Sequence, residues 1–272
     1  MLDDARGRHE ELRAGEPVVS ALRARCPHCR TFTAVAVDSA YQCHSCGREY
    51  AAGLVRVPRA YGEGGEAMAA AASLPLPYPE AAVVEEESLG DQVAAQMRNL
   101  PALPLVLGGC CCAHLGAICA LSERRGRLGV VWIDAHGDLN TPECSPSGDE
   151  WGMPLRMAID AGAVSPEDVA LVGARSLDPP EVAYMTSVGI DADIVRALDG
   201  CNRVYVAFDC DVLRPGELAV FRPEPGGPTM EEAETMLESI AGNHTLAGLG
   251  LTGLTAAADP AVVARLAVAA GL

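Results

Sequence analysis

Short apolar runs alternate with amphipathic stretches along the chain from residue 81 onward. The apolar runs, which have the length and composition of buried strands, lie at residues 104–109, 129–134, 169–174, 203–209 and 246–252. Apolar residues recur at helical spacing in the stretches at 89–100, 113–123, 153–162, 229–242 and 260–271. This alternation predicts an α/β fold of three layers, a parallel sheet with helices on both faces.

Acidic side chains and one histidine follow two of the predicted strands. Asp134, His136 and Asp138 come at the end of the run at 129–134, and Asp209 and Asp211 at the end of the run at 203–209. Alternate residues leaving a strand point the same way, and parallel sheets bind ligands beyond the carboxyl ends of their strands. We therefore expect these five side chains to converge.

Carboxylates crowded in this way raise one another's pKa values and resist ionisation. Divalent cations relieve the repulsion, and oxygen-rich ligands with one imidazole suit manganese, with bridging carboxylates suiting a pair of metals. The alternative is that the acidic loops only cap helices. Two alternating sets at strand ends favour a metal site.

Two segments resemble the signatures of the arginase and agmatinase (ureohydrolase) family. DAHGDLNTPECSPSG, at 134–148, is similar to the family's DAHxDxNTP…SG. FDCDVLRPGELAVFRPEPGG, at 208–227, resembles its FDxDxxDP signature, with Arg214 in place of the last aspartate. The resemblance covers about residues 85–260 and implies an arginase-like fold.

The resemblance also implies a mechanism. It suggests two manganese ions held by Asp134, His136, Asp138, Asp209 and Asp211, and a bridging hydroxide that attacks an amidine carbon and releases urea. Asp138 would be the catalytic residue that accepts the proton of this hydroxide.

The family's GGDHS reads GGCCC here, which puts Cys111 in the place of the remaining histidine ligand. A thiolate ligand would shift the preference from manganese toward zinc, iron or cobalt. His114, one helical turn later, is a substitute ligand or a helix histidine without a role.

The resemblance also extends to positions that contact the substrate in the family. These positions favour an amino-acid-like small molecule as the substrate. Asn140 and Ser147 match residues near an amino-acid carboxylate, Asp149 lies beside them, and Asp178 resembles the aspartate that faces an α-amino group. The alternatives are turn chemistry for Asn140, an ordinary loop for Ser147 and Asp149, and a cap on a helix beginning at Pro179 for Asp178.

Two departures concern catalysis and specificity. The family's SGNLHG reads SGDEWG, so Trp151 replaces the histidine that shuttles protons and forms either a pocket wall or ordinary packing. Gly253 stands where the family has a glutamate that pairs with a guanidinium, and its absence argues against efficient hydrolysis of arginine.

Four cysteines form two CxxC pairs, Cys26 with Cys29 and Cys43 with Cys46. This spacing predicts a structural four-sulfur zinc site in a zinc-ribbon-like module, and a redox dithiol is the alternative. His28 and His44, inside the pairs, are expected to face solvent. The sequence thus divides into a polar N-terminal segment that resembles a short helix (1–20), the zinc-ribbon-like module (21–52) and the metallohydrolase domain (53–272).

The chain has a net charge of −17 and no lysine, which excludes Schiff-base chemistry and a P-loop lysine and disfavours nucleic acid or anionic membranes as partners. Arg23, Arg25, Arg30 and Arg48 alone suggest nucleic-acid binding. The polar start and the lack of a long apolar run indicate a cytoplasmic protein. The family resemblance favours a homo-oligomer.

The leading hypothesis is a metal-dependent hydrolase of a carbon–nitrogen bond in a small guanidino, amidino or amide compound. Trp151 and Gly253 motivate the alternative, a catalytically impaired relative that acts as a binding or regulatory subunit.

Overall fold

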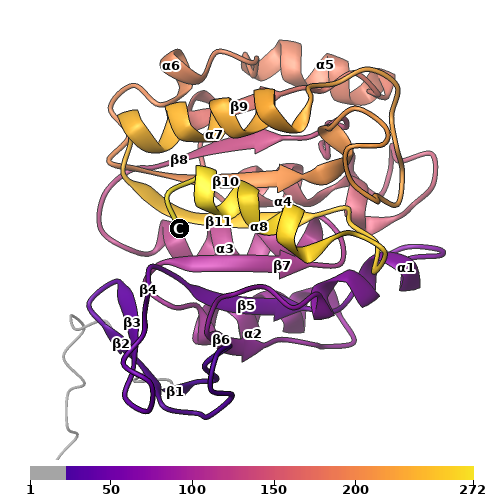
Figure 1. The fold of residues 1–272 in the computed structure, drawn as a ribbon. Coiled ribbons are helices and arrows are strands. Elements are labelled where there is room, and N and C mark those ends of the chain that lie inside the picture. Colours follow the sequence, from indigo (N-terminus) through magenta and orange to yellow (C-terminus); the bar gives the residue numbers. More distant parts are fainter. Residues whose placement is uncertain (1–22) are drawn as a thin grey trace, which may run out of the picture.

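The computed structural model describes residues 23–272, so the short polar helix expected within residues 1–20 lies outside the described part. The main feature of residues 23–272 is a parallel sheet of seven strands, with the order β6-β5-β7-β11-β10-β8-β9 (Figure 1). The strands are β5 (Gly53–Val57), β6 (Glu80–Val83), β7 (Pro104–Gly108), β8 (Leu128–Ile133), β9 (Val169–Val172), β10 (Arg203–Asp209) and β11 (Leu246–Thr252). The five apolar runs are β7 to β11, which confirms the predicted parallel sheet.

Helices cover both faces of this sheet, as the three-layer prediction requires. One face carries α2 (Leu89–Asn99), α3 (Cys112–Ser122), α4 (Pro154–Asp160) and α5 (Pro179–Val188). The other carries α6 (Ile194–Ala197), α7 (Met230–Asn243) and α8 (Pro260–Ala269). Among the described residues, no helix combines the length and apolar character needed to cross a membrane.

Alternation along the strands divides the apolar core into two parts. On β8, Val130 and Trp132 pack with the helices of the first face, whereas Val131 and Ile133 pack with those of the second. All four side chains are buried. Because both faces of the strand are covered, its sequence is a continuous apolar run rather than an alternating one.

Side-chain caps fix where several helices begin. The Ser88 hydroxyl accepts from the backbone N–H of Asp91 at the start of α2, and Thr229 and Glu232 form a reciprocal capping box at the start of α7. Asp259 caps α8, whose first residue is Pro260. The segment at 59–80 contains the short helix α1 (Glu66–Ala69) and a 3-10 turn at Ala70–Ser73.

A small antiparallel sheet precedes the large one and attaches to its edge. Its strands are β1 (Arg23–Ala24), β2 (Ala34–Val37), β3 (Ala40–Cys43) and β4 (Glu49–Tyr50), in that order. Arg25 and Glu80 exchange two backbone hydrogen bonds, of 2.9 and 3.0 Å, which join this sheet to β6. The small sheet ends at Tyr50 and the large sheet begins at Gly53.

Candidate active site and cysteine cluster

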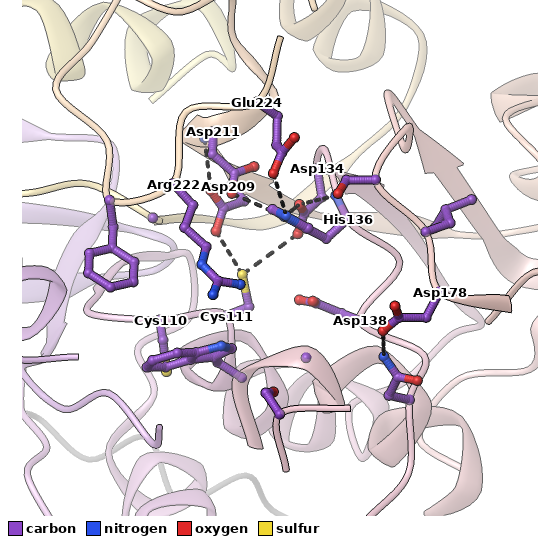
Figure 2. Close-up of a pocket in the computed structure, with 18 of the residues that line it drawn as sticks. Cys110, Cys111, Asp134, His136, Asp138, Asp178, Asp209, Asp211, Arg222 and Glu224 are labelled. Atoms are coloured by element: carbon purple, nitrogen blue, oxygen red, sulfur yellow. Dashed lines mark hydrogen bonds and ion pairs between the residues drawn. The ribbon is translucent and has the colours of Figure 1, made fainter. Parts of the chain in front are cut away.

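Three strands of the large sheet, β7, β8 and β10, bring the predicted ligands together at their carboxyl ends. β8 and β10 pair in parallel register, so Asp134 and Asp209 leave neighbouring strand ends. β11 lies between β10 and β7, and β7 leads into Cys111 at the start of α3. Figure 2 shows these side chains converging on one pocket, as the strand-end argument predicted.

Cys111, Asp134 and Asp209 form the first group that could hold a metal ion, with ligand atoms within 4.8 Å of one another. The Sγ atom of Cys111 lies 2.8 Å from Oδ2 of Asp209 and 3.7 Å from Oδ2 of Asp134. All three residues are buried. The Cys111 thiol therefore lies between the carboxylates of Asp134 and Asp209.

Asp134, His136 and Asp211 form the second group. Nδ1 of His136 lies 3.4 Å from Oδ1 of Asp134 and 3.1 Å from Oδ2 of Asp211. Its other ring nitrogen, Nε2, lies 3.4 Å from Glu224. A carboxylate behind a metal-ligating imidazole orients the ring and strengthens it as a ligand. The sequence reasoning missed Glu224, although it stands inside the quoted second signature.

Asp138 is buried beside both groups, and its Oδ2 atom has no hydrogen-bond partner among the described residues. Its backbone adopts the left-handed conformation, with a φ of 51°, which residues other than glycine rarely do. An orphaned buried carboxylate oxygen is costly unless a cation or a proton satisfies it. This atom, together with the oxygen-rich donor set, fits a bound divalent cation.

The carboxylates raise one another's pKa values as the sequence argument expected. Burial and the neighbouring Asp211 raise the pKa of Asp209 to about 7, and burial and Asp134 raise that of Asp211 to about 6. The pKa of Asp138 is raised well above its usual range, mainly by burial and then by Asp134. For His136, burial lowers the pKa, but Asp134 and Asp211 outweigh it and raise the value to about 12. Bound cations would replace the protons that these groups otherwise need.

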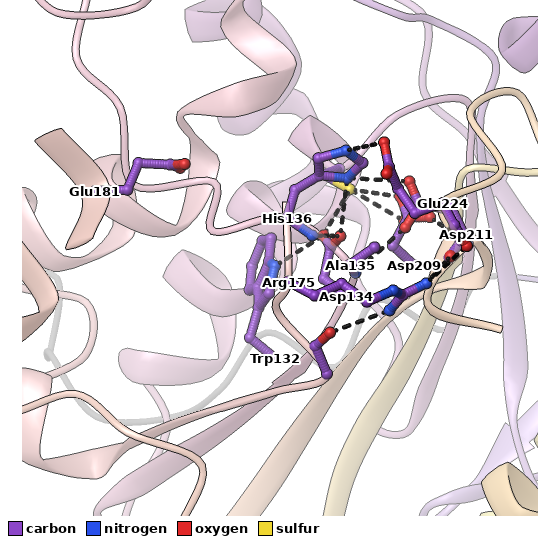
Figure 3. Close-up of polar contacts among 12 residues, drawn as sticks. Trp132, Asp134, Ala135, His136, Arg175, Glu181, Asp209, Asp211 and Glu224 are labelled. Carbon is purple, nitrogen blue, oxygen red and sulfur yellow. Dashed lines mark hydrogen bonds and ion pairs between the residues drawn. The ribbon is translucent and has the colours of Figure 1, made fainter. Parts of the chain in front are cut away.

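Two side chains outside the sequence predictions hold the ligand loops in place (Figure 3). Arg175 donates from Nη2 to the backbone carbonyls of Asp211 and Glu224, at 3.2 Å each, which ties the loop after β9 to the loop after β10. Trp132 donates from Nε1 to Oδ2 of Asp134, at 3.1 Å. Neither residue belongs to an acidic motif, so only the three-dimensional structure reveals their roles.

The ligand groups form the floor of a pocket of about 240 Å³, a size suited to a small molecule. Asn140, Ser147, Trp151 and Asp178 line it, as expected of substrate-contacting residues. Asp149 does not line it, and its Oδ1 instead accepts a hydrogen bond from the backbone N–H of Glu63, at 3.0 Å. The structure therefore brings four of these five residues together.

Asp178 both begins a helix and lines the pocket. It is the N-cap residue of α5, and the Glu181 side chain accepts from its backbone N–H at 2.8 Å. Its Oδ2 accepts from Nδ2 of Asn140, at 2.9 Å, within the pocket lining. The cap and the pocket position are thus compatible.

Trp151 forms part of a pocket wall with Phe221, and their ring centroids lie 6.0 Å apart in an edge-to-face arrangement. A Cβ atom on Gly62 would lie 2.5 Å from the indole, so the loop before α1 packs directly against it. Trp151 therefore both walls the pocket and packs against a loop.

Gly253 follows β11 with a φ of 71°. A Cβ atom at this position would lie 1.9 Å from Oδ1 of Asp209. The chain conformation thus excludes any side chain here, a glutamate included.

His114 belongs to neither candidate metal group. It is buried, with Nδ1 3.1 Å from the Tyr205 hydroxyl and Nε2 3.0 Å from Oγ1 of Thr252. Burial lowers the pKa of His114 to about 3, so the ring is neutral. Thr252 in turn lies 3.2 Å from Oδ2 of Asp209, which connects His114 to a ligand through one hydroxyl.

The family model described as "Arginase family" matches residues 71–271, most of the chain and all of the candidate active site. This chain belongs to the arginase family. It is 34% identical over 181 residues to arginase from Bacillus caldovelox, which covers 56% of this chain and 59% of the relative. It is 32% identical over 166 residues to arginase from Bacillus subtilis (strain 168), which covers 50% of this chain and 56% of the relative. The chain thus spans just under three fifths of the length of these relatives.

Solved structures of the arginase family share the fold. Arginase from Bacillus subtilis superposes with a TM-score of 0.70 at 22% identity, covering 80% of this chain and 97% of that one. Formimidoylglutamase from Bacillus subtilis gives a TM-score of 0.65 at 16% identity, covering 80% of this chain and 86% of that one. These identities show a common fold and leave the substrate open.

The four paired cysteines precede the arginase-family match and form a separate cluster. Cys26, Cys29, Cys43 and Cys46 offer four sulfur atoms within 4.8 Å of one another, and none forms a disulfide. The Sγ atoms of Cys26 and Cys46 are 3.8 Å apart, and those of Cys29 and Cys43 are 3.6 Å apart. His28 and His44 are exposed. This arrangement fits a tetrahedral four-sulfur site.

Proposed function

We propose that this arginase-family protein is a metal-dependent hydrolase that cleaves a carbon–nitrogen bond in a small guanidino, amidino or amide compound. One observation carries the proposal, the position of Asp134 between the two candidate metal groups. Its Oδ2 faces Cys111, at 3.7 Å, and its Oδ1 faces His136, at 3.4 Å. Asp134 would therefore hold both cations, with one oxygen for each group, if the site is loaded with two metal ions.

The ligand set supports two unequal cation positions. Asp134, Asp209 and the buried Asp138 would hold one cation together with Cys111, and Asp134, Asp211 and His136 would hold the other. Manganese suits the second position, whereas the soft thiolate favours zinc, iron or cobalt at the first. When bound, such cations make hydroxide available near neutral pH by lowering the pKa of coordinated water.

Asp138 is the proposed proton acceptor. Its unpartnered Oδ2 is buried at the pocket floor, where a proton released by the attacking water can be held. Trp151 cannot exchange protons at neutral pH, because an indole is only a donor. Asp138 would therefore also return the proton to the departing nitrogen.

The opposite wall supports an amino-acid-like substrate. The Asn140 amide, the Ser147 hydroxyl and the Asp178 carboxylate all line the pocket. Together they offer both hydrogen-bond donors and hydrogen-bond acceptors. We propose that Asp178 accepts from a substrate amino group while Asn140 and Ser147 contact a carboxylate. Asp149 lies outside the lining, and its place in the mechanism is limited to holding the backbone of Glu63.

Turnover after separate metal loading tests the function. Protein loaded with manganese, zinc, cobalt, iron or nickel is screened for release of urea or ammonia from guanidino acids, amidines and amides. We expect product with at least one metal. Asp134→Asn should abolish it and lower the content of both cations, whereas Asp160→Asn, which changes an exposed carboxylate paired with Arg156, should leave both unchanged.

Absence of product with every metal and substrate class would favour the binding or regulatory subunit that Trp151 and Gly253 suggest.

For the cysteine cluster we propose structural zinc, because a module this small gains most of its folding free energy from the metal. Elemental analysis of the intact protein tests this assignment.

A further inference from the structure

Arg222 is the one arginine or lysine among the described residues that line the pocket. Within residues 23–272 its side chain forms neither a hydrogen bond nor an ion pair, in contrast to Arg175 on the adjoining loop. Figure 2 shows the side chain extending into the pocket rather than away from it. A free guanidinium facing a substrate pocket needs an anionic or oxygen-rich partner.

The acidic side chains of the lining are already engaged. Four of them form the proposed metal ligands, namely Asp134, Asp138, Asp209 and Asp211. Glu224 faces Nε2 of His136, at 3.4 Å. Asp178 accepts from Asn140, and the buried Glu181 accepts from the backbone N–H groups of Leu139 and Asp178, at 3.0 and 2.8 Å. Apart from Asp178, which we propose for a substrate amino group, no described carboxylate in the pocket is left to pair with a cationic reacting group.

The wall beside the ligands cannot supply that carboxylate either. Any side chain on Gly253 would collide with Asp209, so neither an acidic residue nor a larger one fits there. The pocket thus has the unpaired positive charge of Arg222 and lacks the negative charge of the glutamate that the family has at the position of Gly253. Both changes disfavour a substrate that carries a guanidinium.

We propose that Arg222 determines specificity by selecting a substrate that bears a carboxylate and whose scissile group is an uncharged amide or ureide. This proposal deepens the proposed hydrolase function and rests on it. Arg222 is the charged partner of the substrate carboxylate, for which Asn140 and Ser147 are the neutral contacts. Trp151 and Phe221 pack against the apolar part of the substrate. A guanidino acid of the same length would bring a second positive charge beside the metal-ligand groups, where no carboxylate is left to pair with it.

The reaction that follows is hydrolysis without any further reactant. Water forms a bond from its oxygen to the carbonyl carbon, the carbon–nitrogen bond breaks with both electrons going to nitrogen, and that nitrogen takes up the protons of the water. An amide gives a carboxylate and ammonium, and a ureide gives a carbamate and ammonium.

Three ligands with a common four-carbon chain test the effect of each substrate charge separately. 4-Ureidobutyrate has the uncharged end group and the carboxylate, 4-guanidinobutyrate replaces the uncharged end with a cation, and butylurea lacks the carboxylate. Binding to the manganese-loaded full chain is measured by calorimetry at low ionic strength. We expect 4-ureidobutyrate to bind at least about tenfold more tightly than each of the other two, the size of one charge-assisted contact.

Arg222→Glu should reverse the order so that 4-guanidinobutyrate binds best, and Arg222→Met should remove the advantage of the carboxylate. Arg125→Glu makes the same charge change at an exposed site between α3 and β8, on the opposite edge of the sheet, and should leave the order unchanged. The proposal is overturned if 4-guanidinobutyrate binds the wild-type protein best, if Arg222→Glu leaves the ratios unchanged, or if none of the three binds. Turnover is scored separately, so binding in the expected order without product would reject hydrolysis alone.

Discussion

The Sγ atom of Cys111 lies 2.8 Å from Oδ2 of Asp209, where β10 ends and α3 begins. A contact of this kind needs a proton between sulfur and oxygen. Burial and then the charge of Asp209 raise the pKa of the Cys111 thiol well above its usual range, so the proton stays on sulfur without metal. Thiolate and carboxylate are the ligating forms, and a cation bound here must therefore displace the proton.

The stability of the metal-free protein should fall as the pH rises. The folded-state pKa values of Asp209 and Asp211, about 7 and about 6, exceed the usual carboxyl value near 4. The folded state thus binds more protons than the unfolded state between these values, and the free energy of unfolding decreases across that window. Thermal unfolding in chelator should give a lower Tm at pH 8 than at pH 5. Asp209→Asn should flatten this dependence, and a wild-type Tm that rises from pH 5 to pH 8 would contradict it.

Cobalt should report the thiolate ligand directly. In protein whose cysteine cluster already holds zinc, added cobalt is expected to give a near-ultraviolet sulfur-to-cobalt charge-transfer band. Cys111→Ser should abolish the band, whereas Cys119→Ser, which changes a cysteine outside both candidate groups, should preserve it. Cys111→His should in addition reduce the preference for cobalt relative to manganese. A band that survives Cys111→Ser would remove Cys111 from the ligand set.

The Thr252 hydroxyl should contribute substantially to the free energy of unfolding. Its hydroxyl lies 3.0 Å from Nε2 of His114, 3.2 Å from Oδ2 of Asp209 and 3.4 Å from Sγ of Cys111. Thr252→Val keeps the shape but leaves His114 without this partner, which should lower the free energy of unfolding by about 1–3 kcal/mol.

Thr235→Val is the matched control, because its hydroxyl bonds only to a carbonyl on the exposed face of α7. The control should change stability by less than about 0.5 kcal/mol. Equal effects of the two substitutions, measured by denaturant unfolding, would mean that the buried hydroxyl has no special role.

The cysteine cluster should bind its metal independently of the pocket. Cys26→Ser is expected to remove one zinc ion per chain and to lower the Tm, because the small sheet has few buried apolar residues of its own. Metal content of the pocket should stay unchanged, and Cys119→Ser should lose no zinc. Simultaneous loss of all metals from Cys26→Ser would show that the two sites depend on each other.

The sequence predicted β7 to β11 and missed β5 and β6, the first two strands of the large sheet along the chain. The run that becomes β10 is apolar from Val204 to Phe208, so the strand is easily recognised. β6 is Glu80–Val83, a short edge strand that follows a proline-rich segment, and β5 directly follows the small sheet at Gly53–Val57. Neither has the flanking pattern that distinguishes a strand from a loop.

The sequence predicted those residues of the site that directly follow a strand. Alternation after β8 and β10 brought out the acidic ligands, because register fixes which residues leave neighbouring strands together. Arg222 and Glu224 lie in an irregular loop, where spacing does not determine side-chain direction. Glu224 acts only through His136, and the isolation of Arg222 is visible only once every neighbouring carboxylate has been assigned a partner.

Anomalous scattering from a crystal of the manganese- or zinc-loaded protein shows directly whether cations neutralise the clustered carboxylates. We expect two peaks at the pocket floor, one on each side of Asp134, with Cys111 beside one and His136 beside the other. Absence of both peaks in a crystal with a filled cysteine cluster would contradict this expectation.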